Sequence, residues 1–88
     1  MKDKFKQWLA NKGYSLETPS GKPSTVYDYA KRIDKVCQWE SMVWSELAAN
    51  IERIINEYNT GGVKSERGDM SRRAVINALL RFKEFLSE

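Results

Sequence analysis

Two stretches of the sequence place basic side chains next to serine or threonine. Each stretch lies at the start of a segment with helical periodicity. The first stretch contains Lys22, Ser24 and Thr25, and the second contains Arg72 and Arg73. Free N–H groups give a helix N-terminus partial positive charge, so phosphate is a natural ligand there. Both stretches could therefore bind phosphate, although side chains of this kind are also common on ordinary solvated surfaces.

Further polar side chains follow one to three turns later, on the side away from the apolar residues. They are Lys31 and Lys35 after the first stretch and Asn77 after the second. Basic side chains contact backbone phosphates, and an asparagine can reach base edges in a major groove. Double-stranded DNA is therefore a candidate partner. The alternative is a set of solubilising charges without a partner.

Residues suited to other chemistry are scarce. The chain has no histidine, which removes the commonest general base and most zinc sites. Its one cysteine, Cys37, lies on an apolar stripe, where a buried structural thiol is the better interpretation than a nucleophile. Gly61 and Gly62 follow an expected helix instead of a strand, so they indicate no phosphate-binding loop. We expect no catalysis, no cofactor and no metal ion from this chain alone.

Charge is distributed unevenly along the chain, whose formal net charge is +3. Residues 1–37 carry eight basic and four acidic side chains, whereas residues 38–60 carry one basic and four acidic ones. Residues 61–83 are again basic, with six basic and two acidic side chains. An acidic middle between two basic segments suits a molecule with one basic face.

The elements that must position these side chains are helices. Apolar residues recur at helical spacing over about residues 3–12, 24–40, 45–59 and 71–87, and no segment alternates like a strand. We expect Ser45 to cap the third helix and Asp69 or Ser71 to cap the fourth. Residues 14–23 and 59–70 read as loops. The 88 residues therefore predict one compact all-α domain of four helices, spanning 1–88.

The expected core follows from the same stripes. It consists of Trp8, Leu9, Tyr29, Ile33, Ile51, Ile54, Tyr58, Leu79, Phe82 and Phe85. Tyr27 and Trp39 fall at stripe edges and are the aromatic residues that we consider for a ligand surface. Leu80 falls opposite the core face of the last helix, where it could mark a contact with another domain or subunit.

The expected cellular compartment follows from the number of cysteines and from the hydropathy of the sequence. One cysteine cannot form an intrachain disulfide, and no apolar run approaches the roughly 20 residues of a membrane span. The cytoplasm is the expected compartment.

The order and spacing of the apolar positions resemble a known family. The most specific pieces are Thr25-x-x-x-Tyr29 near the second helix start and the closing Ala78-Leu79-x-x-Phe82-x-x-Phe85-Leu86. They look like the SAM-like N-terminal core-binding domain of phage integrases, which are tyrosine recombinases. The resemblance covers nearly the whole chain. It departs in the first loop, where residues 16–23 look like an insertion.

The resemblance implies a function in DNA integration and recombination. In such recombinases this domain and a C-terminal catalytic domain clamp the DNA, and the second and fourth helices face the major groove. The contacts implied here are Ser24, Thr25, Lys31, Arg72, Arg73 and Asn77. The catalytic residues belong to the other domain, so the expected partners are duplex DNA and a catalytic domain or other recombinase subunits. The alternative is a small helical protein–protein interaction module that keeps the fold without binding DNA.

Overall fold

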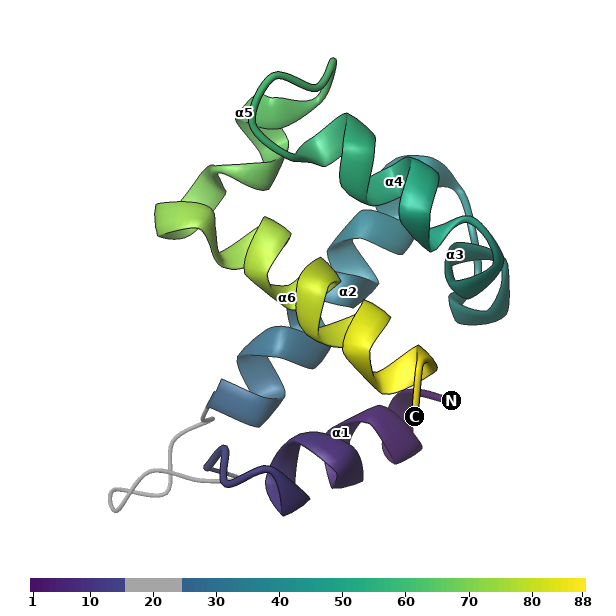
Figure 1. The fold of residues 1–88 in the computed structure, drawn as a ribbon, viewed down its shortest axis with the longest axis vertical. Coiled ribbons are helices and arrows are strands. Elements are labelled where there is room, and N and C mark those ends of the chain that lie inside the picture. The colour runs from purple at the N-terminus through teal and green to yellow at the C-terminus, as the bar shows by residue number, and fades with distance from the viewer. Residues whose placement is uncertain (16–24) are drawn as a thin grey trace.

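The computed structural model describes residues 1–15 and 25–88, and within these ranges it consists of six helices without a strand (Figure 1). The helices are α1 (Lys2–Asn11), α2 (Thr25–Glu40), α3 (Trp44–Ala49), α4 (Ile51–Tyr58), α5 (Ser65–Gly68) and α6 (Met70–Leu86). The all-helical prediction is confirmed for the described residues. None of their helices is long and apolar enough to cross a membrane.

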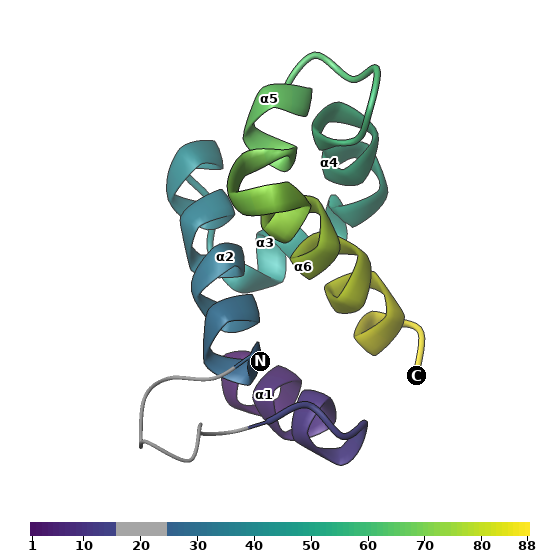
Figure 2. The ribbon, with the colours of Figure 1, turned by 90° about the vertical axis from the view of Figure 1, so that its left-hand side faces the viewer.

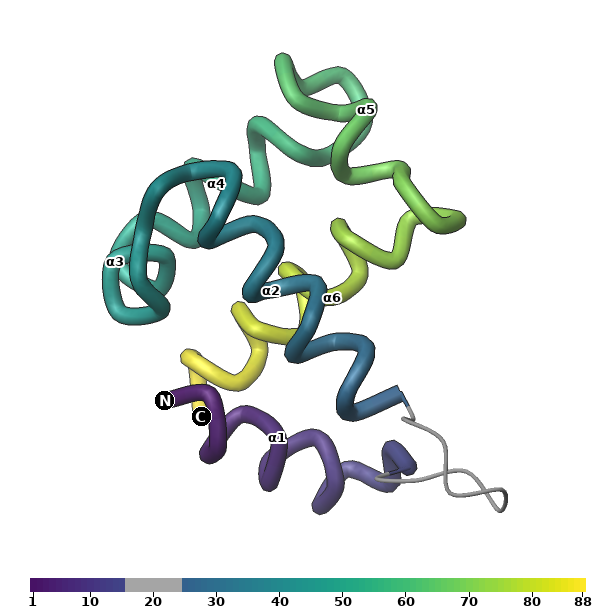
Figure 3. The backbone as a smooth tube through the Cα atoms, turned by 180° about the vertical axis from the view of Figure 1, so that it is seen from behind, coloured from purple at the N-terminus to yellow at the C-terminus, as the bar shows by residue number. Residues whose placement is uncertain are grey.

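The last helix, α6, is the centre of the fold, because it contacts each of the other five helices. Its most extensive contact is with α2, which crosses it: α6 lies in front in Figure 1, and α2 lies in front in the reverse view of Figure 3. Apolar spacing explains the pairing. Val26, Ala30, Ile33 and Cys37 of α2 recur every three or four residues and are all buried.

Because α6 is covered from several sides, its buried surface is wider than one stripe. Ile76 is fully buried beside the expected Val75 and Leu79. Leu80 is half-buried and packs against the core. The expectation that Leu80 faces away from the core is therefore wrong, and it gives no reason to infer a contact with another subunit there.

The expected core is otherwise largely confirmed. Leu9, Ile33, Ile54, Tyr58, Leu79 and Phe82 are fully buried and Ile51 nearly so, whereas Trp8, Tyr29 and Phe85 are partly buried against them. The expected core omitted Phe5, whose ring centroid lies 5.3 Å from that of Phe82 and 5.5 Å from that of Phe85. This aromatic contact attaches α1 to the central helix.

The expected third helix, 45–59, is in fact two helices divided at Asn50. The side-chain amide of Asn50 donates a hydrogen bond to the carbonyl oxygen of Glu46 at 2.8 Å. Asparagine competes for backbone groups in this way and interrupts regular helices. The helix also begins one residue earlier than expected. Val43 occupies the N-cap position and donates its N–H to the Glu46 carboxylate at 3.2 Å, so Ser45 is not the cap.

The expected 59–70 loop contains one short helix, α5, that packs against α4 and α6. Gly68 makes this packing possible, since a Cβ at that position would overlap the carbonyl oxygen of Tyr58. The close approach seats α5 against the end of α4 and next to the start of α6, as Figure 2 shows. This packing connects the end of α4 to the start of α6.

Candidate nucleic-acid interface

A hollow of about 320 Å³ separates the start of α2 from the start of α6; we call it the α2–α6 hollow. Its lining residues are Thr25, Asp28, Tyr29, Arg32, Ser71, Arg72, Ala74 and Asn77. Three of the predicted site residues, Thr25, Arg72 and Asn77, are thus brought together from segments about 45 residues apart in sequence. In Figure 2, α2 and the beginning of α6 lie side by side.

A second hollow of about 400 Å³, here the Trp39 hollow, continues along α2. It is lined by Lys31, Arg32, Asp34, Lys35, Gln38, Trp39 and Met70, so it contains the predicted Lys31 and Lys35. Trp39 stacks on Tyr58 with ring centroids 6.3 Å apart. The Lys35 ammonium and the Arg67 guanidinium lie 5.6 and 5.2 Å from the Trp39 ring centroid. Cation–π contacts therefore concentrate positive charge at this edge of α2.

A third, smaller hollow of about 80 Å³ lies between α1 and α2, and we call it the α1 hollow. Lys2, Lys6, Tyr27, Ala30, Lys31 and Asp34 line it. The three hollows adjoin one another, because Arg32 lines both the first and the second while Lys31 lines both the second and the third.

Except for Lys2, which pairs with Asp34, the cations that line these hollows have no acidic partner within the described ranges. Within the described ranges, Lys6, Lys31, Arg32 and Arg72 form neither an ion pair nor a side-chain hydrogen bond. Most other cations in those ranges bind carboxylates. Unpaired positive charge is therefore gathered along α2. One unpaired acid, Asp28, lines the α2–α6 hollow beside these cations. A surface of this kind attracts polyanions.

Arg32 and Lys6 were not among the residues predicted from sequence. Arg32 follows Asp28 by four positions and Thr25 by seven, which places all three on one face of α2. That spacing could have identified Arg32. No sequence signal indicated that α1 would lie beside α2 with Lys6 facing the hollow between them.

Arg73 is separated from Arg72, although the two are adjacent in sequence. Its guanidinium lies 3.0 Å from Asp69 Oδ1 and donates to Thr60 Oγ1 at 2.9 Å and to Asn59 Oδ1 at 3.3 Å. These partners belong to the segment between α4 and α6. The structure therefore places Arg72 in the α2–α6 hollow and Arg73 outside it.

The backbone explains the separation. Ser71, Arg72 and Arg73 have φ angles of 53°, 58° and 66° and lie in the left-handed region, so regular right-handed α6 follows only after Arg73. A non-glycine residue there costs about 1–2 kcal/mol. Asp69, one of the two expected caps, occupies the N-cap position, but it makes no side-chain capping hydrogen bond, because its carboxylate binds Arg73 instead.

Two predicted residues, Lys22 and Ser24, lie outside the described residues. Thr25 is the first residue of α2 and is exposed. Among the described residues, the structure contains no cluster of histidine, cysteine, aspartate or glutamate side chains that could hold a metal ion.

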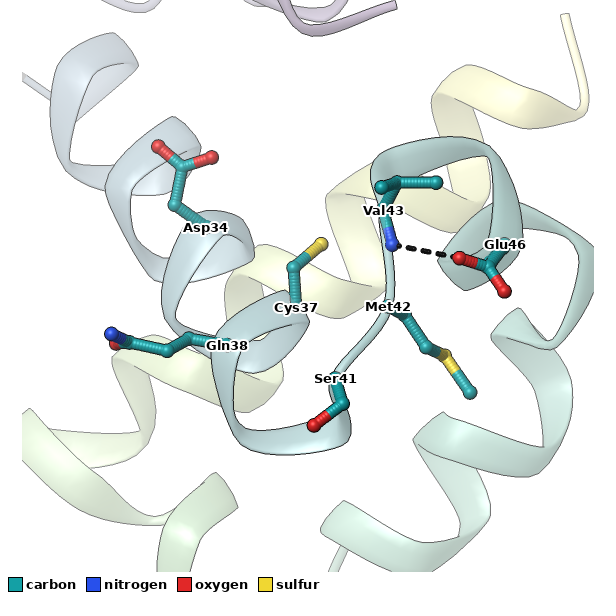
Figure 4. Close-up of a pocket in the computed structure, with 7 residues that line it drawn as sticks. All are labelled: Asp34, Cys37, Gln38, Ser41, Met42, Val43 and Glu46. Atoms are coloured by element: carbon teal, nitrogen blue, oxygen red, sulfur yellow. Dashed lines mark hydrogen bonds between the residues drawn. The ribbon is translucent and has the colours of Figure 1, made fainter.

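A larger depression of about 580 Å³ lies at the other end of α2, and its character differs (Figure 4). It is lined by Asp34, Cys37, Gln38, Ser41, Met42, Val43 and Glu46 and includes no basic side chain. Cys37 is 7% exposed, as expected for a structural thiol. Burial, together with the charge of Asp34, raises the pKa of the thiol to about 11. This depression suits neither an anion nor thiolate chemistry.

Comparison of the chain with family models, curated proteins and solved structures finds no match. The resemblance to integrase core-binding domains consequently rests on the sequence pattern described above.

Proposed function

We propose that this chain is a DNA-binding module that grips duplex DNA through α2 and the start of α6. The observation that carries the proposal is the row of unpaired cations, Lys31, Arg32 and Arg72, along adjoining hollows. The acidic side chains of α4 line none of these hollows. They bind other cations instead: Glu52 pairs with Lys83, and Glu57 pairs with Arg53 and Lys64. The acids of α4 therefore do not neutralise the basic face, whose own carboxylates are Asp28 and the Lys2-paired Asp34.

The proposed contacts are of two kinds: contacts to phosphates, which position the protein on the duplex, and contacts to base edges, which recognise sequence. Lys31, Arg32 and Arg72 neutralise phosphates, and the exposed Thr25 hydroxyl at the start of α2 donates to a phosphate oxygen. Asn77 follows Arg72 by five positions and lines the same hollow, where we propose that its amide reaches a base edge. Lys35 and Trp39 form the edge of this surface.

By resemblance, the architecture is that of a SAM-like integrase core-binding domain, and the module acts in DNA integration and recombination. Cleavage and joining would then belong to a C-terminal catalytic domain. The grip itself would contribute affinity and orientation, and it would be weak by itself because it is one half of a clamp.

An NMR titration of the isotope-labelled chain with a short duplex tests this proposal. We expect shifts along α2 and the start of α6, with a dissociation constant on the order of 10⁻⁴–10⁻⁶ M at physiological salt. Neutralising about three to five phosphates gives a slope of log K against log salt of roughly −2.7 to −4.5. Shifts confined to α3 and α4, or no shifts at millimolar DNA, would contradict DNA binding and favour the protein-interaction module.

A further inference from the structure

The α1 hollow holds two positive charges that no described acid balances. Its one carboxylate, Asp34, is already occupied: Lys2 Nζ lies 2.6 Å from Oδ2, and the Trp44 indole donates to Oδ1 at 2.8 Å. Lys2 and Asp34 therefore neutralise each other. Lys6 and Lys31, which line the same hollow, remain unpaired within the described ranges.

The third polar group of the hollow is a phenol. Tyr27 is 46% exposed, and among the described residues its hydroxyl has no hydrogen-bond partner. Ala30 supplies the small apolar part of the lining. The free groups of the hollow are thus two ammonium donors and a hydroxyl, a set that matches an anion with several acceptor oxygens.

We propose that the α1 hollow is a phosphate-binding site in which Lys6, Lys31 and Tyr27 hold the oxygens of one phosphate group. A volume of about 80 Å³ leaves room for a single tetrahedral oxyanion. The integrase resemblance implied Lys31 as a contact but gave no role to Lys6 or Tyr27.

The proposal rests on the proposed function for the source of the phosphate, which is the backbone of the gripped duplex. Lys31 belongs to both the α1 hollow and the Trp39 hollow, so the two are parts of one surface. A backbone passing along α2 would meet Arg72 at one end of this surface and Lys6 at the other. The third helix in contact with DNA is then α1.

Lys4 provides a matched control for Lys6. Both are basic residues of α1 without an ion-pair partner in the described ranges, but Lys4 lines none of the three hollows. Lys6→Gln and Lys4→Gln therefore remove the same charge from the same helix. The comparison separates a specific contact from the effect of net charge.

Duplex affinity measured against salt concentration distinguishes the two variants. We expect Lys6→Gln to reduce the magnitude of the salt slope by about 0.9, which is an approximately eight-fold loss of affinity at 0.1 M salt when the lines meet at 1 M. Lys4→Gln should leave the slope unchanged. Tyr27→Phe keeps the fold and all charges, and it should weaken binding without changing the slope, because it removes a neutral donor.

Titration with inorganic phosphate gives an independent measurement on the isolated chain. We expect amide shifts at Lys6, Tyr27 and Lys31 that persist in Lys4→Gln and vanish in Lys6→Gln. If phosphate binds in the α1 hollow but the duplex does not bind, the phosphate site is supported and the proposed DNA-binding function is refuted. Phosphate binding with equal duplex slopes for both variants would identify free phosphate as the ligand. Duplex binding on α2 and α6, with no phosphate shifts and equal slopes, would overturn the α1 site alone.

Discussion

The ammonium group of Lys64 lies 2.8 Å from Oε2 of Glu40, across 24 positions of sequence. The Tyr58 hydroxyl donates to the same oxygen at 2.8 Å, and the Glu40 side chain is only 7% exposed. This small network connects the last residue of α2 to the segment that leads into α5. Because α5 precedes the start of α6, the network fixes one end of the basic surface relative to α2.

Removing Lys64 should destabilise the fold. Lys64→Met leaves the nearly buried Glu40 carboxylate with the Tyr58 hydroxyl as its remaining hydrogen-bond donor, and we expect a loss of about 1–3 kcal/mol in the free energy of unfolding. Arg53→Met is the control, since Arg53 forms an exposed pair with Glu57 one turn away that is worth about 0.5 kcal/mol at most. Urea denaturation measures both. Equal losses for the two variants would show that the Glu40–Lys64 pair does not hold the helices together.

Acid should weaken the same network. Burial acts to raise the pKa of Glu40, but the hydrogen bonds from Lys64 and Tyr58 outweigh it and hold the pKa below its ordinary value. A folded-state pKa below the unfolded one gives stability that is present above the unfolded pKa of about 4.3 and is lost as pH falls through the folded pKa. Glu40→Gln should therefore flatten the decline of the melting temperature below about pH 4.5. An unchanged acid profile in this variant would place the titration elsewhere.

Cys37 should resist alkylation until the chain unfolds. The raised pKa of about 11, against an ordinary 9.0, lowers the thiolate fraction at pH 8 by roughly 100-fold. Burial of the side chain further restricts access. We expect iodoacetamide to modify the native protein at least that much more slowly than the urea-unfolded chain. Comparable rates in the two states would mean that the depression in Figure 4 opens to expose the thiol.

Sequence periodicity predicted the fold class and most of the core, because buried stripes such as Ile33 on α2 and Leu79 on α6 leave a direct signal. It missed features that depend on tertiary packing. On a helical projection Leu80 falls on the face opposite the apolar stripe. It is nevertheless partly buried, because α6 is packed against other helices on several sides. Asn50 divides a helix through one side-chain hydrogen bond that spacing does not reveal.

The candidate site was predictable where it depended on helix faces. Thr25, Arg72 and Asn77 meet in one hollow, as expected from the starts of two helices. Lys6 was missed because only the packing of α1 against α2 brings it there. The separation of Arg72 from Arg73 could not be predicted either, since it arises from a left-handed turn of three residues without a glycine.

That turn makes a prediction at Ser71. Its φ of 53° suits glycine, so Ser71→Gly should raise the free energy of unfolding by about 0.5–1 kcal/mol after allowing for the greater chain entropy of glycine. Ser45→Gly, inside the right-handed helix α3, should instead lower it by about 0.5–1 kcal/mol. Thermal unfolding of the pair provides the test. Destabilisation by both variants would indicate that residue 71 is right-handed in solution.

The same turn predicts that two neighbouring arginines behave differently. Arg72→Gln should leave stability unchanged, because Arg72 has no partner in the described ranges, and should reduce the magnitude of the DNA salt slope by about 0.9. Arg73→Gln loses the contacts to Asp69, Thr60 and Asn59, so we expect about 0.5–1.5 kcal/mol of destabilisation and little change in slope. Both variants carry the same net charge, which makes each the control for the other. If Arg73→Gln changed the slope as much as Arg72→Gln while melting like the wild type, Arg73 would leave Asp69 to meet a phosphate. The left-handed turn would then not separate the two side chains when DNA is bound.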